Sequence, residues 1–110
     1  MLKMDLQYIR GILFVRLGGS LDRKNTYRIN NDLVPIILKH RVKFLVYNLY
    51  ELEKIDESGV DALLNTKCAI KANKGKICLC EVANNIKPYI RRLHIKNVLD
   101  ERRVFELIKI

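Results

Sequence analysis

The sequence has no tryptophan, and its 110 residues include only three cysteines, two prolines and five glycines. No hydrophobic run approaches the ~18–20 residues that a membrane-spanning helix requires. The N-terminal segment alternates polar and apolar residues and lacks the continuous apolar core of a signal peptide. No segment is rich in glycine, serine or proline, as a flexible linker would be. We therefore expect a single domain covering residues 1–110, located in the cytoplasm and without a membrane span.

The cysteines are odd in number and lie in a chain without a recognisable export signal, so we expect them to be reduced. Cys78 and Cys80 alternate within a short apolar run, where a strand would point both to one face. A metal site would need further ligands, and His40 and His94 lack a suitable spacing to supply them. We predict that these two cysteines and Cys68 pack in the interior, and that both histidines lie on the surface or at helix ends. We expect no metal and no cofactor.

Positive charge dominates the composition. Twenty-one lysines and arginines against twelve aspartates and glutamates give a formal net charge of +9, spread over both halves of the chain. Such a charge attracts acidic partners of any kind, and a basic domain that binds nucleic acid is one hypothesis it leaves open. The sequence lacks an obvious set of exposed aromatic residues on which bases would stack. We therefore expect a solvated basic surface and no direct binding of nucleic acid.

Hydrophobic periodicity predicts alternating strands and helices along the chain. Alternating or continuous apolar residues, rich in branched side chains, predict strands at residues 2–8, 12–17, 42–47 and 76–82. Apolar residues at helical spacing predict helices at residues 25–40 and 58–73, a short one through Leu93, and a last one after Asp100. Strands followed by helices in this order imply right-handed crossovers. We therefore expect an α/β fold with a small mixed β-sheet and helices packed against it.

Glycines, prolines and polar clusters predict where these elements end. Arg10-Gly11 predicts a tight turn between the first two strands, and Gly18-Gly19 predicts the end of the second. Pro35 should kink or divide its helix, because proline removes a backbone donor and clashes with the preceding turn. Residues 50–57 should form a loop, and Gly75 should end the helix that follows it.

No set of residues in the sequence supports catalysis. Gly18-Gly19 lacks the further glycines of a phosphate-binding loop. A serine or cysteine nucleophile requires a neighbouring base and a group that orients this base, and neither histidine stands in such a pattern. The acidic pairs within residues 51–57 are typical of solvated loop charge. We therefore predict that the protein is not an enzyme.

The segment Asp56-Glu57-Ser58-Gly59-Val60-Asp61 follows the strongest strand and opens a helix. Ser58 and Asp61 have the spacing of a Ser-x-x-Asp capping box, which is a local stabilising device. A phosphate on Ser58 would also be tolerated, because it would face unpaired amides and the positive end of the helix dipole. It would add ~1.5–2 negative charges at a surface that a partner could recognise. The residues alone leave both interpretations open.

Three blocks of sequence together carry a resemblance to a known family. They are Leu17-Gly18-Gly19-Ser20-Leu21-Asp22, Val46-Tyr47-Asn48-Leu49 and Ile55-Asp56-Glu57-Ser58-Gly59-Val60. Their residues and spacing resemble the STAS domain of bacterial anti-sigma-factor antagonists, and the match extends over essentially all 110 residues. That family has a Gly-x-Leu-Asp turn, a Val-x-Asn/Asp-Leu strand end and an Asp-Ser-Ser-Gly helix start. Glu57 differs from the pattern, since it stands where the family has a small hydroxyl residue.

The resemblance implies a binding protein that switches between partners. In the family, an anti-sigma factor with serine kinase activity phosphorylates the serine immediately before the glycine, here Ser58. The unmodified antagonist binds the anti-sigma factor and frees a sigma factor, phosphorylation breaks this complex, and a serine phosphatase restores it. By position, the resemblance places Asp22, Asp56, Glu57, Ser58 and Gly59 at the surface that binds the kinase.

The resemblance also leaves an alternative function. Some relatives act in stress-signalling assemblies or as small subunits of lipid transporters. A STAS-type scaffold or transporter-associated subunit that binds its partner without phosphorylation is therefore the second hypothesis. The positive net charge contrasts with the acidic balance expected of the well-known antagonists, and it is compatible with an acidic partner or with such a different role.

Overall fold

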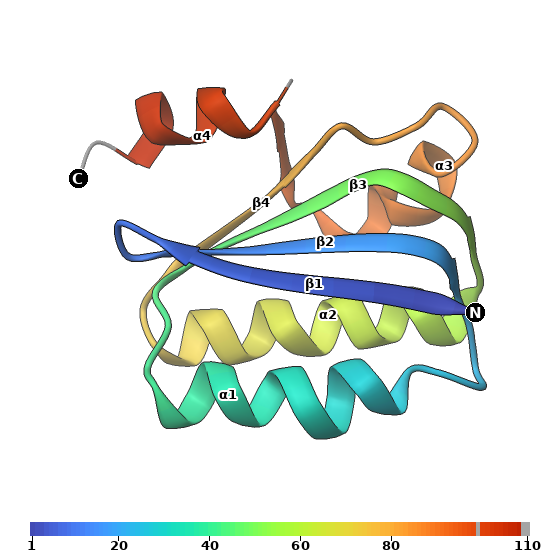
Figure 1. Cartoon of the computed structure of the whole chain (residues 1–110), viewed down its shortest axis with the longest axis horizontal. Coiled ribbons are helices and arrows are strands. Elements are labelled where there is room, and N and C mark those ends of the chain that lie inside the picture. The colour runs from blue at the N-terminus through green and yellow to red at the C-terminus, as the bar shows by residue number, and fades with distance from the viewer. Residues whose placement is uncertain (99, 109–110) are drawn as a thin grey trace.

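The computed structural model describes residues 1–98 and 100–108, and in this part of the chain one mixed sheet has the strand order β1-β2-β3-β4-β5 (Figure 1). The strands are β1 (Leu2–Ile9), β2 (Ile12–Leu21), β3 (Phe44–Ile55), β4 (Lys76–Cys80) and β5 (Lys96–Val98). The helical segments are η1 (Arg28–Leu33), α1 (Val34–Lys39), α2 (Glu57–Ala72), α3 (Lys87–Ile90), η2 (Arg91–Leu93) and α4 (Glu101–Ile108). β1 is antiparallel to β2, and the other neighbouring strands are parallel. This confirms the predicted α/β fold with a small mixed sheet.

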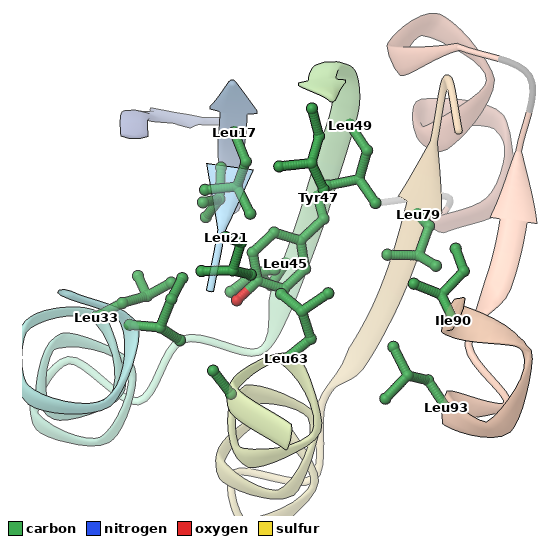
Figure 2. Close-up of a cluster of buried hydrophobic side chains, with 14 of the residues drawn as sticks. Leu17, Leu21, Leu33, Leu45, Tyr47, Leu49, Leu63, Leu79, Ile90 and Leu93 are labelled. Atoms are coloured by element: carbon green, nitrogen blue, oxygen red, sulfur yellow. The ribbon is translucent and has the colours of Figure 1, made fainter. Parts of the chain in front are cut away.

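Helices cover both faces of the sheet, with α1 and α2 on one side and α4 on the other (Figure 1). The larger core lies on the side of α1 and α2, and it includes Leu17, Leu45, Tyr47, Leu63 and Leu79 (Figure 2). The smaller core lies on the opposite side and contains Ile12, Phe14, Val46, Cys78, Cys80 and Val104. Because β3 is buried on both faces, its first half is an almost continuous apolar run, as is typical of a central parallel strand.

Two predicted strand ends are wrong, because both strands continue beyond them. β2 passes through Gly18-Gly19 and ends at Leu21, with irregularities in its pairing to β3 on either side of these glycines. Gly19 has a φ of +78°, and a Cβ there would collide with the carbonyl oxygen of Met1. The predicted loop at residues 50–57 is instead largely strand, since β3 keeps its parallel pairing with β2 up to Ile55.

Several predicted turns are confirmed. Arg10 and Gly11 both have positive φ, 51° and 82°, as a tight hairpin turn between β1 and β2 requires. Pro35 lies in the first turn of α1, where the π-helical segment η1 changes into an α-helix. The end of α2 is a Schellman motif, in which Lys74 takes the left-handed conformation and the Gly75 amide donates to the Ile70 carbonyl at 2.9 Å.

The prediction for the cysteines is confirmed for two of the three. Cys78 and Cys80 are buried in the smaller core, and burial raises the pKa of their thiols to about 11 and about 12. Both are therefore protonated at neutral pH. The prediction is wrong for Cys68, which is exposed. Its position on α2 falls on the outer side of the helix, away from the sheet.

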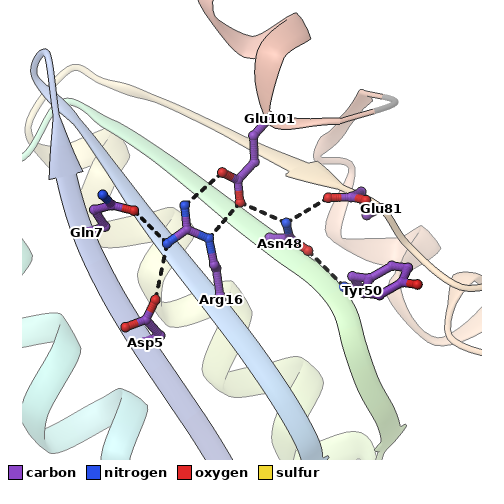
Figure 3. Close-up of polar contacts among 7 residues, drawn as sticks. All are labelled: Asp5, Gln7, Arg16, Asn48, Tyr50, Glu81 and Glu101. Atoms are coloured by element: carbon purple, nitrogen blue, oxygen red, sulfur yellow. Dashed lines mark hydrogen bonds and ion pairs between the residues drawn. The ribbon is translucent and has the colours of Figure 1, made fainter.

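An ion pair attaches α4 to the sheet. Arg16 of β2 donates to both carboxylate oxygens of Glu101, from Nε at 2.9 Å and from Nη2 at 2.8 Å (Figure 3). Asn48 of β3 donates to the same carboxylate at 2.8 Å. The hydrogen bond from Arg16 lowers the pKa of Glu101 below its usual value. The predicted helix after Asp100 is present, and Asp100 caps it by accepting a hydrogen bond from the Arg103 amide at 3.1 Å.

Replacing Glu101 with glutamine should lower the free energy of unfolding by about 1 kcal/mol at neutral pH. Because the native pKa of Glu101 is lowered, this contribution is fully present above its unfolded pKa of ~4.3 and is lost as the pH falls through the lower native value. Denaturant titrations between pH 3 and 7 should therefore show the wild type and the variant converging below pH ~4. Glu106→Gln is the matched control, because the side chain of Glu106 is 72% exposed and its ion pair with Arg103, at 3.9 Å, is long and therefore weak. A Glu101→Gln difference that is independent of pH would contradict the role of this ion pair.

Candidate functional site

The carboxyl ends of β2 and β3 meet the first turn of α2 at one edge of the sheet. The two strands are parallel, and their pairing ends with Leu21 opposite Ile55. Asp22 therefore follows β2 at the same edge where residues 56–59 follow β3. The Asp56 amide donates to the Leu21 carbonyl at 3.3 Å, which joins the two segments directly. Crevices at the carboxyl ends of parallel strands are common binding sites in α/β proteins.

Asp56 is the residue that organises this edge. Its Oδ1 accepts a hydrogen bond from the Gly59 amide at 2.9 Å and so caps α2. Its Oδ2 accepts from the Arg23 amide at 3.1 Å, in the segment that follows β2. One carboxylate thus fixes both the start of the helix and the position of the neighbouring loop.

The predicted capping box of Ser58 and Asp61 is wrong. The helix begins at Glu57, one residue before Ser58, and its cap is Asp56. Ser58 is the second residue of the first turn and is partly exposed. Its hydroxyl is therefore not needed to cap the helix, which removes the purely local explanation for a serine here.

Gly59 is a packing requirement of the same turn. A Cβ at this position would lie 2.5 Å from the Leu21 carbonyl oxygen and 2.8 Å from Cγ1 of Ile55. The absence of a side chain lets the first turn of α2 lie against the end of β2. Gly59 is buried, so it shapes the surface that carries Ser58 without forming part of it.

Asp22 belongs to a compact turn at the end of β2. Its Oδ1 accepts from the Lys24 amide at 3.0 Å, and its own amide donates to Oδ1 of Asn25 at 2.9 Å. A shallow cavity of about 430 Å³ opens beside this turn, lined by Asp22, Arg23, Lys24, Asp56, Glu57 and Ser58. The structure therefore brings four of the five predicted site residues around one cavity, with Gly59 beneath it.

A second, larger hollow adjoins the first and shares Asp22 and Asp56 with it. It has a volume of about 550 Å³ and extends along the ends of β2 and β3 to Asn85, Ile86 and Tyr89. Tyr89 is an aromatic side chain that is 51% exposed. The region around Ser58 thus combines a polar rim with one accessible aromatic ring.

The described residues contain no cluster of three or more side chains with metal-binding groups. In the same part of the chain, no helix has the length and hydrophobicity needed to cross a bilayer. The arrangement around Ser58 contains neither histidine, and it offers a serine hydroxyl among charged groups.

Comparison with known proteins identifies the family. The profile of the STAS domain matches residues 3–108. The chain belongs to the STAS domain family. An anti-sigma F factor antagonist from Paenibacillus polymyxa is 27% identical over 109 residues, covering 99% of this chain and 86% of that protein.

Solved structures confirm the STAS fold. The anti-sigma factor antagonist SpoIIAA in its unphosphorylated form gives a TM-score of 0.81 at 19% identity, covering 97% of this chain and 98% of that one. The Bacillus cell fate determinant SpoIIAA in its phosphorylated form gives a TM-score of 0.77 at 19% identity, covering 96% and 99%. The 27% identity over 109 residues makes the protein a homologue of an anti-sigma F factor antagonist. Such antagonists are non-enzymatic regulators, in agreement with the predicted lack of catalysis.

The structure of this STAS domain places Arg92 beside Ser58, and the sequence did not predict this position. Its Nη2 lies 2.9 Å from Oε2 of Glu57 and 3.1 Å from Oδ1 of Asp61, which flank Ser58 in the first turns of α2. Arg92 comes from η2, more than thirty residues later in the chain. The sequence predicts only a solvated basic surface, and the position of Arg92 depends on contacts with residues more than thirty positions away in the chain. Its charge offsets the carboxylates that would otherwise repel a phosphate on Ser58.

Replacing Asp56 with alanine should lower the free energy of unfolding by about 1 kcal/mol, because the helix cap is lost. Ser58→Ala should change the free energy of unfolding by no more than ~0.5 kcal/mol, because the serine does not cap α2. Chemical denaturation of the two variants measures the difference directly. A larger loss in Ser58→Ala than in Asp56→Ala would restore the capping role of the serine.

The ion pairs of Arg92 should reduce the cost of negative charge at position 58. Ser58→Asp should therefore destabilise the domain more in an Arg92→Gln background than in the wild type, by about 0.5 kcal/mol. A double-mutant cycle followed by denaturation gives this coupling energy. Arg91→Gln is the control, since the neighbouring Arg91 forms no ion pair with the described residues. Equal effects in both backgrounds would show that Arg92 does not act on this position.

Proposed function

We propose that the protein is an anti-sigma-factor antagonist that binds an anti-sigma factor with serine kinase activity and is inactivated by phosphorylation of Ser58. The observation that carries the proposal is the position of Ser58. It is a partly exposed serine in the first turn of α2, beside a cavity, in a turn that Asp56 already caps. Homology to an anti-sigma F factor antagonist supports the same function.

The first turn of α2 is suited to carry a phosphate. Amides in the first turn of a helix have no partner within the helix. Asp56 satisfies the Gly59 amide, and the amides of Glu57 and Ser58 remain oriented toward the end of the helix, where an anion is favoured. A phosphoserine at position 58 is therefore compatible with the folded domain, so its effect falls on the partner complex.

Phosphorylation would change the charge of the proposed partner surface. Around Ser58 lie the acidic side chains of Asp22, Asp56, Glu57 and Asp61 and the basic side chains of Arg23, Lys24 and Arg92. These nearly balance, and a phosphate adds ~1.5–2 negative charges at their centre. A partner that fits the nearly neutral surface would then meet added bulk and uncompensated negative charge. This accounts for release of the anti-sigma factor on phosphorylation.

Glu57 sets a condition on the kinase. The side chain preceding Ser58 is acidic and 79% exposed, and its carboxylate is held by Arg92. The cognate kinase must therefore accept a glutamate before the target serine, and we expect a basic or hydrogen-bonding group in its substrate-binding surface. In the proposed cycle, which operates in the cytoplasm, a serine phosphatase restores the antagonist, and sigma-factor-dependent transcription follows the unmodified form.

Ser58→Ala should still bind the cognate anti-sigma factor but should not be released when ATP is added. The experiment begins with capture of that partner from host lysate on wild-type protein and on Ser58→Asp, which should retain much less of it. The purified complex is then treated with ATP, and dissociation is followed by size-exclusion chromatography. Intact-mass analysis should show one added phosphate on the wild type and none on Ser58→Ala. Ser20→Ala removes the only other serine in the sequence and should still gain one phosphate.

Two results would reject the switch. Release of Ser58→Ala by ATP would show that another event dissociates the complex. Equal capture of one partner by wild type and Ser58→Asp, insensitive to ATP, would favour the alternative of a STAS-type scaffold or transporter-associated subunit. In that case the fold and the family would stand, and the phosphorylation at Ser58 would not.

A further inference from the structure

A cavity with a basic rim lies at the other end of α2, between this helix and the starts of β4 and β5. Its volume is about 290 Å³. The lining residues are Leu45, Lys67, Lys71, Lys76, Ile77, Cys78, His94, Ile95 and Lys96. Lys67 follows Ser58 by nine residues, which is roughly 13 Å along a helix axis, so this cavity is separate from the proposed phosphorylation site.

The floor of the cavity is apolar and exists because β5 is short. β5 pairs with β4 only from Lys96, which lies opposite Cys78. The first two residues of β4 have β3 on one side and no paired strand on the other. Leu45 is buried there, and Ile77 and Ile95 are partly buried and pack against the same larger core. The result is a notch with aliphatic side chains at its base, while the thiol of Cys78 belongs to the smaller core on the other face of the sheet.

Four lysines surround this notch, and no acidic residue lines it. Lys67 and Lys71 are one turn apart on the same side of α2, while Lys76 and Lys96 stand at the starts of β4 and β5. None of the ion pairs among the described residues involves any of these lysines. Cations gathered without a counter-ion create a positive potential that an anionic ligand relieves.

One wall of the cavity is held in place by a lysine. Nζ of Lys67 donates to the Leu93 carbonyl at 2.6 Å, at the end of η2. His94 then has a φ of +51°, a left-handed conformation that turns the chain from η2 into β5. These contacts fix the segment that carries Ile95 and Lys96. Lys71, Lys76 and Lys96 form no ion pair with the described residues.

We propose that this cavity binds a small organic phosphate, in which a phosphomonoester group meets the lysines and a compact apolar group occupies the notch. Lysine binds phosphate as a point charge, and several lysines at the rim of one cavity favour a dianion over a monoanion. The cavity lies at the lower end of the size range of ligand sites, which are ~300–1,000 Å³, so the apolar group is no larger than one ring or a short chain. The same chemistry occurs in soluble metabolites and in the headgroup of phosphatidic acid.

Phenyl phosphate is the probe, and its binding to the full chain is followed by NMR and by isothermal titration calorimetry. We expect saturable binding with a dissociation constant of about 1 mM or tighter. Shifted resonances should lie in residues 67–78 and 94–96. Lys71→Gln and Lys96→Gln should each weaken binding about tenfold. The matched control is Lys87→Gln, which alters an exposed lysine of α3 outside the cavity and should leave binding unchanged.

Inorganic phosphate should bind at least fivefold more weakly than phenyl phosphate, because it cannot use the apolar floor. Equal affinities, equal weakening by all three lysine variants, or the absence of saturable binding would each overturn the proposal. Vesicles containing phosphatidic acid distinguish the source of the ligand. Lys71-dependent binding to them supports a lipid headgroup, whereas binding of phenyl phosphate alone supports a soluble metabolite.

Discussion

The parallel pairing of β2 with β3 is the constraint on which the rest of the molecule depends. It holds these strands in register to Leu21 and Ile55, so that both chains leave the sheet at the same edge. Everything placed around Ser58 follows from this common end. The turn after β2 and the first turn of α2 are brought together, and Gly59 lets the helix lie against the last residue of β2. A shorter pairing would separate Asp22 from Asp56.

At this edge of the sheet, Asp56 has the structural role, which leaves Ser58 without one. Its two carboxylate oxygens satisfy one amide of α2 and one amide of the loop after β2. Ser58 itself does not cap the helix, although it lies in the turn that Asp56 caps. A phosphate on Ser58 would therefore change the charge and bulk of a surface that the hydrogen bonds of Asp56 hold in place.

Local patterns in the sequence were sufficient for much of this architecture. The hairpin turn at Arg10-Gly11, the helix following Asp56 and the general α/β order depend on neighbouring residues, and the structure has all of them. The predictions that were wrong or missing concern elements that depend on partners distant in sequence. The second half of β3 has a polar sequence that resembles a loop, and it is a strand because β2 continues beside it. β5 has only three residues, too few to form a recognisable pattern.

The sequence was sufficient to predict which segment forms the candidate site, but it did not predict which side chains surround Ser58 in three dimensions. The resemblance indicates Ser58 and its neighbours, whereas the spacing of Ser58 and Asp61 suggests a capping box that the structure does not contain. The carboxylate two residues earlier reaches the same turn and is fixed by a second amide, so it is the cap. Arg92 could not be placed, because its two acidic partners lie on another helix.

The positive net charge of the chain therefore does not describe the surface around Ser58. Carboxylates and basic groups nearly balance there, while four lysines without carboxylates gather around the opposite end of α2. Glu57 lies near the positive end of the helix dipole, and Lys71 lies near the negative end, an arrangement that also stabilises the helix. A net charge of +9 is thus compatible with a partner that need not be strongly acidic at the Ser58 end. Part of the excess of positive charge lies at the other end of the same helix, where four lysines line a cavity without carboxylates and the proposed ligand is an anion.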